Sequence, residues 1–481
     1  MAPTATTERL TLTKAFLAWK AFLLALVLAS SFAPSYDSST SLALGLPPDH
    51  PHASSSPSTP LTPTTTLSLA DVIASRLTRW DAIYFTSSAH RGYIHEQEWA
   101  FGPGLPFLVS RILTPLSALL GLDLPRTQKT AALLSIAAAT ASHLIAVLLL
   151  HALTRRLLPR RRGLALTAGL LHVVSPAGLF LSAPYAESLC ACLSFGGYLV
   201  YLSPELVPAP APLRRPLSLV LSGALFGLAT TCRTNGILSG LVFAVELIST
   251  LQGLWAGRTA GSALPRAWRA LPVLVPTILG GILVALGSVV PQAAAYLRYC
   301  SGSSGSSVRP WCQELVPSIY NFVQAHYWNT GFLRYWTLPN APLFLLAIPM
   351  LTILFVSSYT TSLQVLPSLS TSRASRLFLS MSLAQALIAL LTLTSYHVQI
   401  ITRLSCAYPV WYIWLASALS PPDSEPDSKD QAQGESRGGG EDASILPPGA
   451  SGRKYAGAIV KYMVMYASIQ GVLFATFLPP A

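Results

Sequence analysis

Long, nearly uninterrupted runs of apolar residues fill most of this chain, and they leave few folds open to it. Each run has about the 20 residues that a helix needs to cross a hydrocarbon core of ~30 Å. Hydrophobic residues make up 52% of the 481 residues and charged residues only 10%, whereas soluble domains carry about a quarter charged residues. A membrane β-barrel would show short segments of alternating polarity. The sequence therefore predicts an all-α, polytopic membrane protein.

The apolar runs predict about 11 transmembrane helices, within a range of about 8 to 13. The first run is expected to be an uncleaved anchor, because Lys20 lies inside it. Residues 106–122 are apolar but interrupted by Arg111, Pro115 and Gly121, and are expected to lie at the membrane interface without crossing. The expected spans are residues 14–33, 130–153, 163–181, 187–203, 217–232, 235–252, 271–295, 341–358, 377–396, 404–420 and 456–478.

The arginines indicate the orientation, because cytosolic loops of membrane proteins are enriched in Lys and Arg. With residues 1–13 in the cytosol, the arginine-rich loops at 155–162, 214–215, 258–269 and 373–376 share that side. The net charge of +12 is thus explained by topology and does not indicate nucleic-acid binding. The polar tract 421–455 is expected to be a disordered cytosolic loop before a last helix at 456–481.

The opposite, luminal side receives the loops that hold nearly all the motif-like polar residues, which predicts a luminal active site. Within the 34–105 loop, residues 47–66 are rich in Pro, Ser and Thr and are expected to be a disordered spacer. Cys300 and Cys312 flank a Gly/Ser-rich tip, and a disulfide between them is one of two open outcomes if that loop lies in an oxidising lumen. The other loops on this side are 175–188, 232–236, 297–340 and 397–403, and residues 106–420 as a whole form the multi-span domain.

Two carboxylates of the first luminal loop, Asp81 and Glu96, are the leading acid/base candidates. A carboxylate near the membrane surface can deprotonate a hydroxyl of a substrate whose lipid stays in the bilayer. The alternative for Asp81 is that it pairs with Arg79 and caps a helix. Glu98 is the weaker candidate, and its alternative is an exposed partner for a Lys or Arg. His95 is a candidate for contact with phosphate or sugar, or else a plain surface group.

Arginines at the luminal ends of spans are candidates for binding a phosphate, since the guanidinium fork matches its oxygens. Snorkelling to the membrane surface is the alternative for each of them. The YWNTGFLRYW segment is either a platform for sugar rings or an interfacial aromatic belt. No metal-binding or nucleotide-binding motif occurs, so neither a metal nor a cofactor is expected. The polar binding candidates are Glu187, Arg233, Asn235, Trp328, Arg334, His397, Gln399 and Arg403.

Six ordered motifs between about residue 79 and residue 420 resemble the GPI mannosyltransferase 2 family, which adds the second mannose in glycosylphosphatidylinositol-anchor biosynthesis. The pattern departs from that family at Gly102, where Phe usually precedes the Pro-Gly turn. The motifs are RWDAIYF at 79–85, GYIHEQEWAFGPG at 92–104, SPAGLFLSAPYAES at 175–188, RTNG at 233–236, YWNTGFLRYWTLPNAPLFLLA at 327–347 and HVQIITR at 397–403.

The resemblance implies a multi-span glycosyltransferase of the GT-C type in the endoplasmic reticulum membrane. It implies dolichol-phosphate-mannose as the donor, a mannosylated glucosaminyl-phosphatidylinositol lipid as the acceptor, and an α-1,6 linkage. Fungal members work with a small accessory membrane subunit, which the sequence of this chain does not reveal. Two alternatives stay open: a lipid or solute transporter, although no internal repeat is seen, and a related enzyme acting on another lipid-linked glycan.

The resemblance also implies roles for individual residues. Asp81 matches the acidic residue that such enzymes carry in their first luminal loop and would be the general base. Glu96 would orient the acceptor or support Asp81. Arg79 and Trp80 would contact substrate next to the base. The donor phosphate would be held by Arg233, His397 and Arg403.

Overall fold

The computed structural model describes residues 4–33, 35–47, 67–122, 124–256, 264–301, 309–369, 372–420 and 450–478, and no strand occurs among them. Most of the expected 47–66 spacer and most of the expected 421–455 loop lie outside these described residues. Residues 450–455 belong to a helix, so the last helix begins before residue 456. The all-α prediction is confirmed for the described part of the chain.

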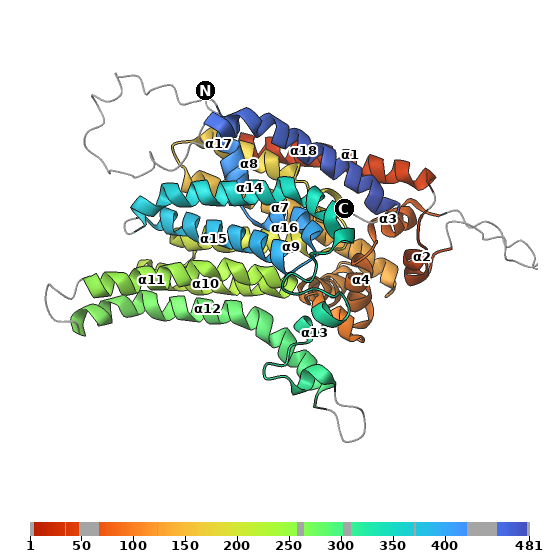
Figure 1. Cartoon of the computed structure of the whole chain (residues 1–481), viewed down its shortest axis with the longest axis horizontal. Helices are drawn as coiled ribbons and strands as arrows, with labels where there is room; N and C mark the ends of the chain where they lie inside the picture. The colour runs from red at the N-terminus through yellow and green to blue at the C-terminus, as the bar shows by residue number, and fades with distance from the viewer. Residues whose placement is uncertain are drawn as a thin grey trace, which may run out of the picture.

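Eight helices within the described ranges are long and apolar enough to cross a membrane, and the chain is a polytopic membrane protein. They run roughly along one direction and form an elongated bundle, with the first and last of them side by side (Figure 1). The eight are α1 (Ala5–Ala29), α7 (Gln128–Leu157), α10 (Ala211–Cys232), α11 (Leu241–Ala256) together with the 3-10 helix Thr234–Gly240 that leads into it, α12 (Leu264–Tyr299), α14 (Ala341–Val365), α15 (Arg373–Thr394) and α18 (Ala450–Ala475).

Three of the expected spans are shorter helices, so the count of about 11 is not confirmed. They are α8 (Arg162–Val173), α9 (Glu187–Leu202) and α17 (Val410–Leu419), with 12, 16 and 10 residues. At 1.5 Å per residue, helices of this length are shorter than a hydrocarbon core of ~30 Å. Prolines limit them: Pro176 follows α8, and Pro409 immediately precedes α17.

Small residues let the long helices approach closely. A Cβ added at Gly223 of α10 would lie 2.4 Å from the Cα of Gly280 in α12. One added at Gly227 would lie 2.4 Å from the carbonyl oxygen of Leu283. Such contacts are typical of membrane helices, whose association depends on close packing because lipid is as apolar as Leu. The pair α10 and α12 thus forms one rigid wall beside the polar end of the bundle.

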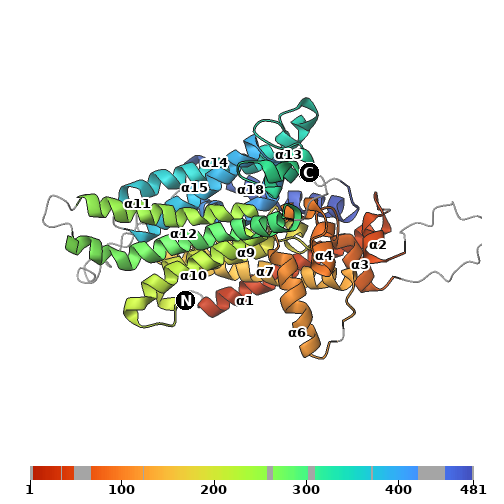
Figure 2. The same cartoon turned by 90° about the horizontal axis from the view of Figure 1, so that it is seen from below.

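The short helices gather at one end of the bundle, where the loops expected to be luminal meet (Figures 1 and 2). Figure 2 shows α6 standing away from the long helices and pointing across their direction. This agrees with a 106–122 segment that does not cross. The helices of this end are α2 (Ser39–Leu44), α3 (Leu69–Leu77), α4 (Ala82–Arg91), α5 (Gly104–Phe107), α6 (Thr114–Leu119), α13 (Ile319–His326) and α16 (Ile401–Leu404).

Candidate functional site

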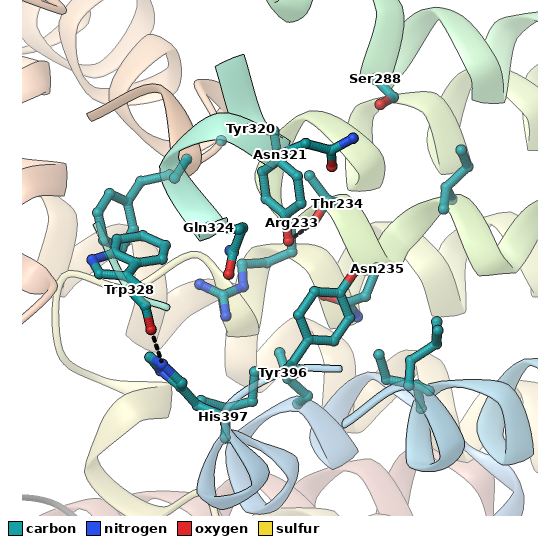
Figure 3. A pocket seen from close by; sticks show the side chains of 18 of the residues that line it. Arg233, Thr234, Asn235, Ser288, Tyr320, Asn321, Gln324, Trp328, Tyr396 and His397 are labelled. Atoms are coloured by element: carbon teal, nitrogen blue, oxygen red, sulfur yellow. Dashed lines mark hydrogen bonds between the residues drawn. The ribbon is translucent and has the colours of Figure 1, made fainter. Parts of the chain in front are cut away.

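A polar cavity of about 450 Å³ lies at the end of the bundle where the short helices gather. Segments far apart in the sequence build it: the start of α4, the end of α10, α13 and the residues around α16 (Figure 3). Six of the sequence-predicted site residues line it, namely Asp81, Arg233, Asn235, Trp328, His397 and Arg403.

Asp81 directly precedes α4, yet its side chain makes no capping hydrogen bond. Its carboxylate instead accepts a hydrogen bond from the Nη2 of Arg403 at 2.9 Å. The Asp81 side chain remains 32% exposed, whereas that of Arg403 is 14% exposed. The alternative in which Asp81 pairs with Arg79 and caps a helix is therefore wrong. Asp81 presents a carboxylate to the cavity.

Glu187 connects the two arginines of the cavity from behind. It is the first residue of α9 and is only 1% exposed. Its Oε1 lies 3.5 Å from the Nη2 of Arg233 and 3.5 Å from the Nε of Arg403. The order of contacts is Asp81, Arg403, Glu187, Arg233, so two carboxylates face two guanidinium groups and their formal charges cancel. Buried charges of this kind need such partners, because desolvation is costly.

Aromatic rings also hold Arg403 in place. Its Cζ lies 5.2 Å from the ring centroid of Phe180 and 5.4 Å from that of Tyr185. Both rings belong to the 175–188 segment, which the resemblance had singled out as a motif. A guanidinium packed between rings and carboxylates has few rotamers open to it, so the geometry around Asp81 is fixed before substrate arrives.

His397 and Trp328, the second residue after α13, border another side of the cavity. The Nε2 of His397 lies 3.4 Å from the carbonyl oxygen of Trp328, as the dashed line in Figure 3 marks. Burial lowers the pKa of His397 below its ordinary value, so the ring is neutral at pH 7. The Trp328 ring packs edge-on against Phe101, with centroids 5.4 Å apart. An aromatic surface and a neutral imidazole therefore border the charged residues.

Sequence reasoning missed the contribution of α13. Tyr320, Asn321 and Gln324 point from this helix into the space around Arg233 (Figure 3). Gln292 of α12 holds the start of α13, because its Oε1 accepts hydrogen bonds from the Ser318 hydroxyl and the Tyr320 N–H, both at 3.3 Å. The Ser318 hydroxyl also accepts a hydrogen bond from the Asn321 N–H, as an N-cap residue does. That N-cap pattern was the available signal, but the helix is too short for its apolar period to stand out.

Gly102, the departure from the family pattern, is explained by close packing. A Cβ at this position would lie 2.2 Å from the carbonyl oxygen of Thr231 and 2.7 Å from that of Cys232. A Cβ at Gly104 would lie 2.5 Å from the Cys232 sulfur. The Pro-Gly turn thus presses its backbone against the end of α10, directly before Arg233. A larger residue here would displace the arginine or the turn.

Several predicted binding residues lie outside the cavity. Arg79 is fully buried and donates from its Nη2 to the Ser35 hydroxyl at 2.9 Å. The Nε1 of Trp80 donates to the Leu478 carbonyl at 3.2 Å. His95 and Arg334 are exposed away from the cavity, and Gln399 accepts a hydrogen bond from the Tyr335 hydroxyl at 3.2 Å. None of these five side chains is placed to touch a ligand in the cavity.

Glu96 also lies outside the cavity, where it binds the 297–340 loop. Its carboxylate accepts hydrogen bonds from the Arg309 guanidinium and the Trp311 indole N–H, each at 3.0 Å. This geometry gives Glu96 an anchoring position and no direct route to a substrate. Of the two outcomes left open for Cys300 and Cys312, the disulfide is the one present, with Cα atoms 5.7 Å apart, and it closes the same loop.

Glu98 pairs with Arg91, which agrees with the alternative to an acid/base role, but its carboxylate is buried and not exposed as that alternative expected. Arg91 donates to both Glu98 oxygens, at 3.3 and 2.6 Å. Burial alone would raise the pKa of Glu98, but hydrogen bonds from Arg91 and from the backbone N–H groups of Ile94 and His95 bring that pKa below its ordinary value. Among the residues placed by the structure, no three His, Cys, Asp or Glu side chains are grouped so as to hold a metal ion.

Solved structures offer only a distant likeness. The apo crystal structure of the Archaeoglobus fulgidus oligosaccharyltransferase gives a TM-score of 0.42 at 13% identity, covering 86% of this chain and 55% of that one. A likeness at this level carries no argument about the site.

Protein sequences give a much closer match. GPI mannosyltransferase 2 of Gibberella zeae is 44% identical over 480 residues, covering 98% of this chain and 97% of that protein. The Chaetomium globosum protein of the same name is 44% identical over 500 residues, covering 98% and 96%. Mouse GPI alpha-1,6-mannosyltransferase 2 is 31% identical over 410 residues, covering 74% and 76%. A model of the family described as "Mannosyltransferase (PIG-V)" matches residues 12–481. With that match over nearly its whole length, and with a polar cavity at one end of an apolar bundle, the chain belongs to the PIG-V family of mannosyltransferases.

Proposed function

We propose that this chain transfers the second mannose, in α-1,6 linkage, from dolichol-phosphate-mannose to a mannosylated glucosaminyl-phosphatidylinositol lipid. The reaction takes place on the luminal side of the endoplasmic reticulum membrane. The family assignment and the names of the relatives support the GPI-anchor precursor as acceptor, and the name of the mouse relative supports the linkage. The observation that carries the proposal is the meeting of Asp81, Arg233, His397 and Arg403 in one cavity.

The proposed step is a single displacement with inversion at the anomeric carbon. An acceptor hydroxyl attacks C1 of the mannose, a C–O bond forms, and the bond from C1 to the phosphate oxygen breaks. The hydroxyl proton passes to the Asp81 carboxylate, which acts as general base, and dolichyl phosphate leaves. Phosphate is a good leaving group, so one carboxylate is sufficient, in contrast to the carboxyl pair of glycosidases. The step uses no cofactor.

The paired charges of the cavity suit this proton transfer. Before the reaction, Asp81 and Glu187 balance Arg233 and Arg403, and the donor phosphodiester adds one negative charge. As the bond to phosphate breaks, the leaving group gains a charge while Asp81 loses its own by protonation. The total charge of the cavity is unchanged, and Arg403 exchanges one anionic partner for another. Such pre-positioned cations stabilise charge where it develops in the transition state.

The other cavity residues have roles that follow from their position. Neutral His397 beside Arg403 offers a hydrogen-bonding group to the donor phosphate without adding a fixed charge. The Trp328 and Phe101 rings supply a face against which a sugar ring can pack. The amide and hydroxyl groups of α13 face Arg233 and are the groups best placed to bind hydroxyls of the glycan.

Cells that lack the second mannosyltransferase of GPI assembly provide the test. Expression of this chain should restore GPI-anchored proteins at the cell surface. Membranes from those cells should then transfer labelled mannose from dolichol-phosphate-mannose to the once-mannosylated precursor. Transfer to a different lipid-linked glycan, with no restoration of surface proteins, would instead favour a related glycosyltransferase and reject the proposed acceptor.

A further inference from the structure

We propose that the segment after α18, Thr476–Leu478, is a positioning device for Asp81 and acts through Trp80 and Phe477. The inference rests on the proposed role of Asp81 as the general base. Neither Trp80 nor Phe477 lines the cavity, so neither touches substrate. Both residues act on Asp81, which does line the cavity.

Trp80 has an unusual backbone for a large residue. Its φ is +53°, in the left-handed region that L-residues with bulky side chains rarely adopt. Trp80 and Asp81 are the two central residues of a tight turn, in which the Ala82 N–H donates to the Arg79 carbonyl at 3.0 Å. The orientation of Asp81 therefore depends on a conformation that Trp80 would not choose in isolation. Contacts elsewhere must hold it there.

The contacts that hold Trp80 come from the segment after α18. The Trp80 ring packs against Phe477 with centroids 5.1 Å apart. Its Nε1 donates to the Leu478 carbonyl at 3.2 Å. The same Phe477 ring lies under the neighbouring arginine, with the Cζ of Arg79 5.1 Å from its centroid. One phenyl ring thus contacts both residues that precede Asp81.

The backbone of Phe477 is also strained, which indicates that its side chain has a role at this position. It occupies the left-handed position of a Schellman motif, with φ +64°. The Phe477 N–H donates to the Phe474 carbonyl at 3.0 Å and the Leu478 N–H to the Leu473 carbonyl at 2.9 Å, which is the hydrogen-bond pattern of that motif. Gly is the usual residue here, because it has no Cβ penalty. A nearly buried Phe at this position strains the backbone, and in return its ring packs against Trp80 and Arg79.

Further contacts tie this segment to the first loop and to the cavity wall. The Tyr36 N–H donates to the Thr476 carbonyl at 3.0 Å. Phe474 packs edge-on against Phe180, with centroids 5.1 Å apart. Phe180 is one of the two rings beneath Arg403, the partner of Asp81. The end of α18 therefore supports both members of the Asp81–Arg403 pair.

The discriminating variant is Phe477→Gly. Gly relieves the positive φ but deletes a nearly buried ring, so the variant should unfold at a lower temperature than wild type while still accumulating in membranes, since the ring packs beyond the end of one helix. Loss of the ring frees the Trp80 turn, and displacement of a catalytic group by ~1 Å can cost up to about 100-fold in rate. We expect kcat to fall on the order of 10-fold or more, with little change in the KM for dolichol-phosphate-mannose. The matched control is Tyr455→Ala, which removes an exposed ring from the far end of the same helix and should leave kcat unchanged.

A double variant separates positioning from a general structural effect. Because Phe477 acts through Asp81, Phe477→Gly should cause no further loss of kcat in an Asp81→Asn background. A wild-type kcat in Phe477→Gly, or a further loss that multiplies with that of Asp81→Asn, overturns the proposal. If Phe477→Gly fails to accumulate, Trp80→Phe decides, since it keeps a ring but deletes the Nε1 donor to Leu478, and an unchanged kcat there also overturns the proposal. A wild-type protein that transfers no mannose would instead refute the proposed function.

Discussion

At the scale of single residues, each ionisable group of the cavity has an identified partner. Asp81 and Glu187 face Arg403 and Arg233, and the cavity is therefore polar without carrying net formal charge from these four groups. A negatively charged donor can therefore enter the cavity without meeting a net charge from these four side chains. Because each group has a different number of charged partners, removing each residue should have a different cost.

Asp81→Asn should lower kcat by about two orders of magnitude or more, on the usual worth of general-base catalysis. The amide keeps the shape and can still contact Arg403, so the protein should accumulate normally. Asp71→Asn is the matched control, because Asp71 does not line the cavity and pairs with Lys129, with Oδ1 and Nζ 2.8 Å apart. Initial rates of mannose transfer in membranes measure both. Near-wild-type transfer by Asp81→Asn would remove it from the role of base.

Replacing Arg233 or Arg403 with Ala should raise the KM for dolichol-phosphate-mannose more than the KM for the acceptor. Each lost charge-assisted contact should cost on the order of 1.5–3 kcal/mol, and Lys should restore little because an ammonium lacks the planar fork. Arg403→Ala should also reduce protein stability, since it leaves two carboxylates without their shared partner. Donor titrations measure the effect, with the exposed Arg334→Ala as control. An unchanged donor dependence would reject phosphate binding by either residue.

His397 predicts one component of the pH dependence of stability. Its folded-state pKa is below the ordinary 6.5 because the ring is buried. As the pH falls through 6.5, His397 is therefore protonated in the unfolded chain before it is protonated in the folded protein. Below that pH the free energy of unfolding decreases. Thermal unfolding of purified protein between pH 7.5 and pH 5 should show a smaller loss of Tm in His397→Gln than in wild type. Equal losses in the two proteins would contradict the assignment.

At the scale of secondary-structure elements, the sequence predicted the long helices well and the short ones poorly. A run of about 20 apolar residues forms a transmembrane helix in a bilayer. Helices α7, α12 and α14 were therefore predictable from composition. The shorter α8, α9 and α17 are covered by neighbouring helices and carry no length signal of their own. Helix α13 has only eight residues, too few to stand out as a period in the sequence, and its place in the cavity depends on Gln292 of another helix.

The same limit applies to the site. Asp81, Arg233 and Arg403 were predictable, because charge at the end of an apolar span calls for a functional reason. Glu96 carried the same signal but binds Arg309 and Trp311. Which of two carboxylates faces a cavity depends on tertiary contacts that no local pattern encodes.

The position of α13 predicts an effect of its anchors on acceptor binding. Glu96→Gln weakens the hold on the 309–313 segment, and reduction of the Cys300–Cys312 disulfide opens the same loop. Either change should raise the acceptor KM several-fold, with kcat lowered far less than by Asp81→Asn. Kinetics against acceptor concentration measure this, with Glu205→Gln at the other end of the bundle as control. A 100-fold loss of kcat at unchanged acceptor KM would restore Glu96 as an acid/base candidate.

At the scale of the whole molecule, the charged groups separate into two sets at opposite ends of the helices. The cavity end holds the Asp81–Arg403 and Glu187–Arg233 pairs. The other end holds Glu246 with Arg215 and Arg376, at 2.8 and 3.2 Å, and Glu8 with Arg155, at 2.7 Å. Arg155, Arg215 and Arg376, which the positive-inside rule assigned to the cytosol, thus lie at the same end, away from the cavity.

This separation predicts the topology. The chain contains no Asn-x-Ser/Thr acceptor of its own, so an engineered one reports its location without background. Acceptors introduced near residues 60 and 310 should be glycosylated, and those near residues 160 and 435 should not. Mobility shifts that disappear on deglycosylation measure this in cells. Glycosylation near 160, or its absence near 60, would place Asp81 on the wrong side for a luminal donor.

The contact between the Trp80 turn and the end of α18 has a consequence for biosynthesis. The first residues of the cavity leave the ribosome long before the residues that fix them, since Trp80 and Phe477 are 397 positions apart. Insertion of the earlier helices can give a protein with every cavity residue present and Asp81 still unplaced. Activity should therefore begin only once α18 has been inserted and has packed beside α1. A chain released before that point would be a folded but silent intermediate, and a natural substrate for quality control.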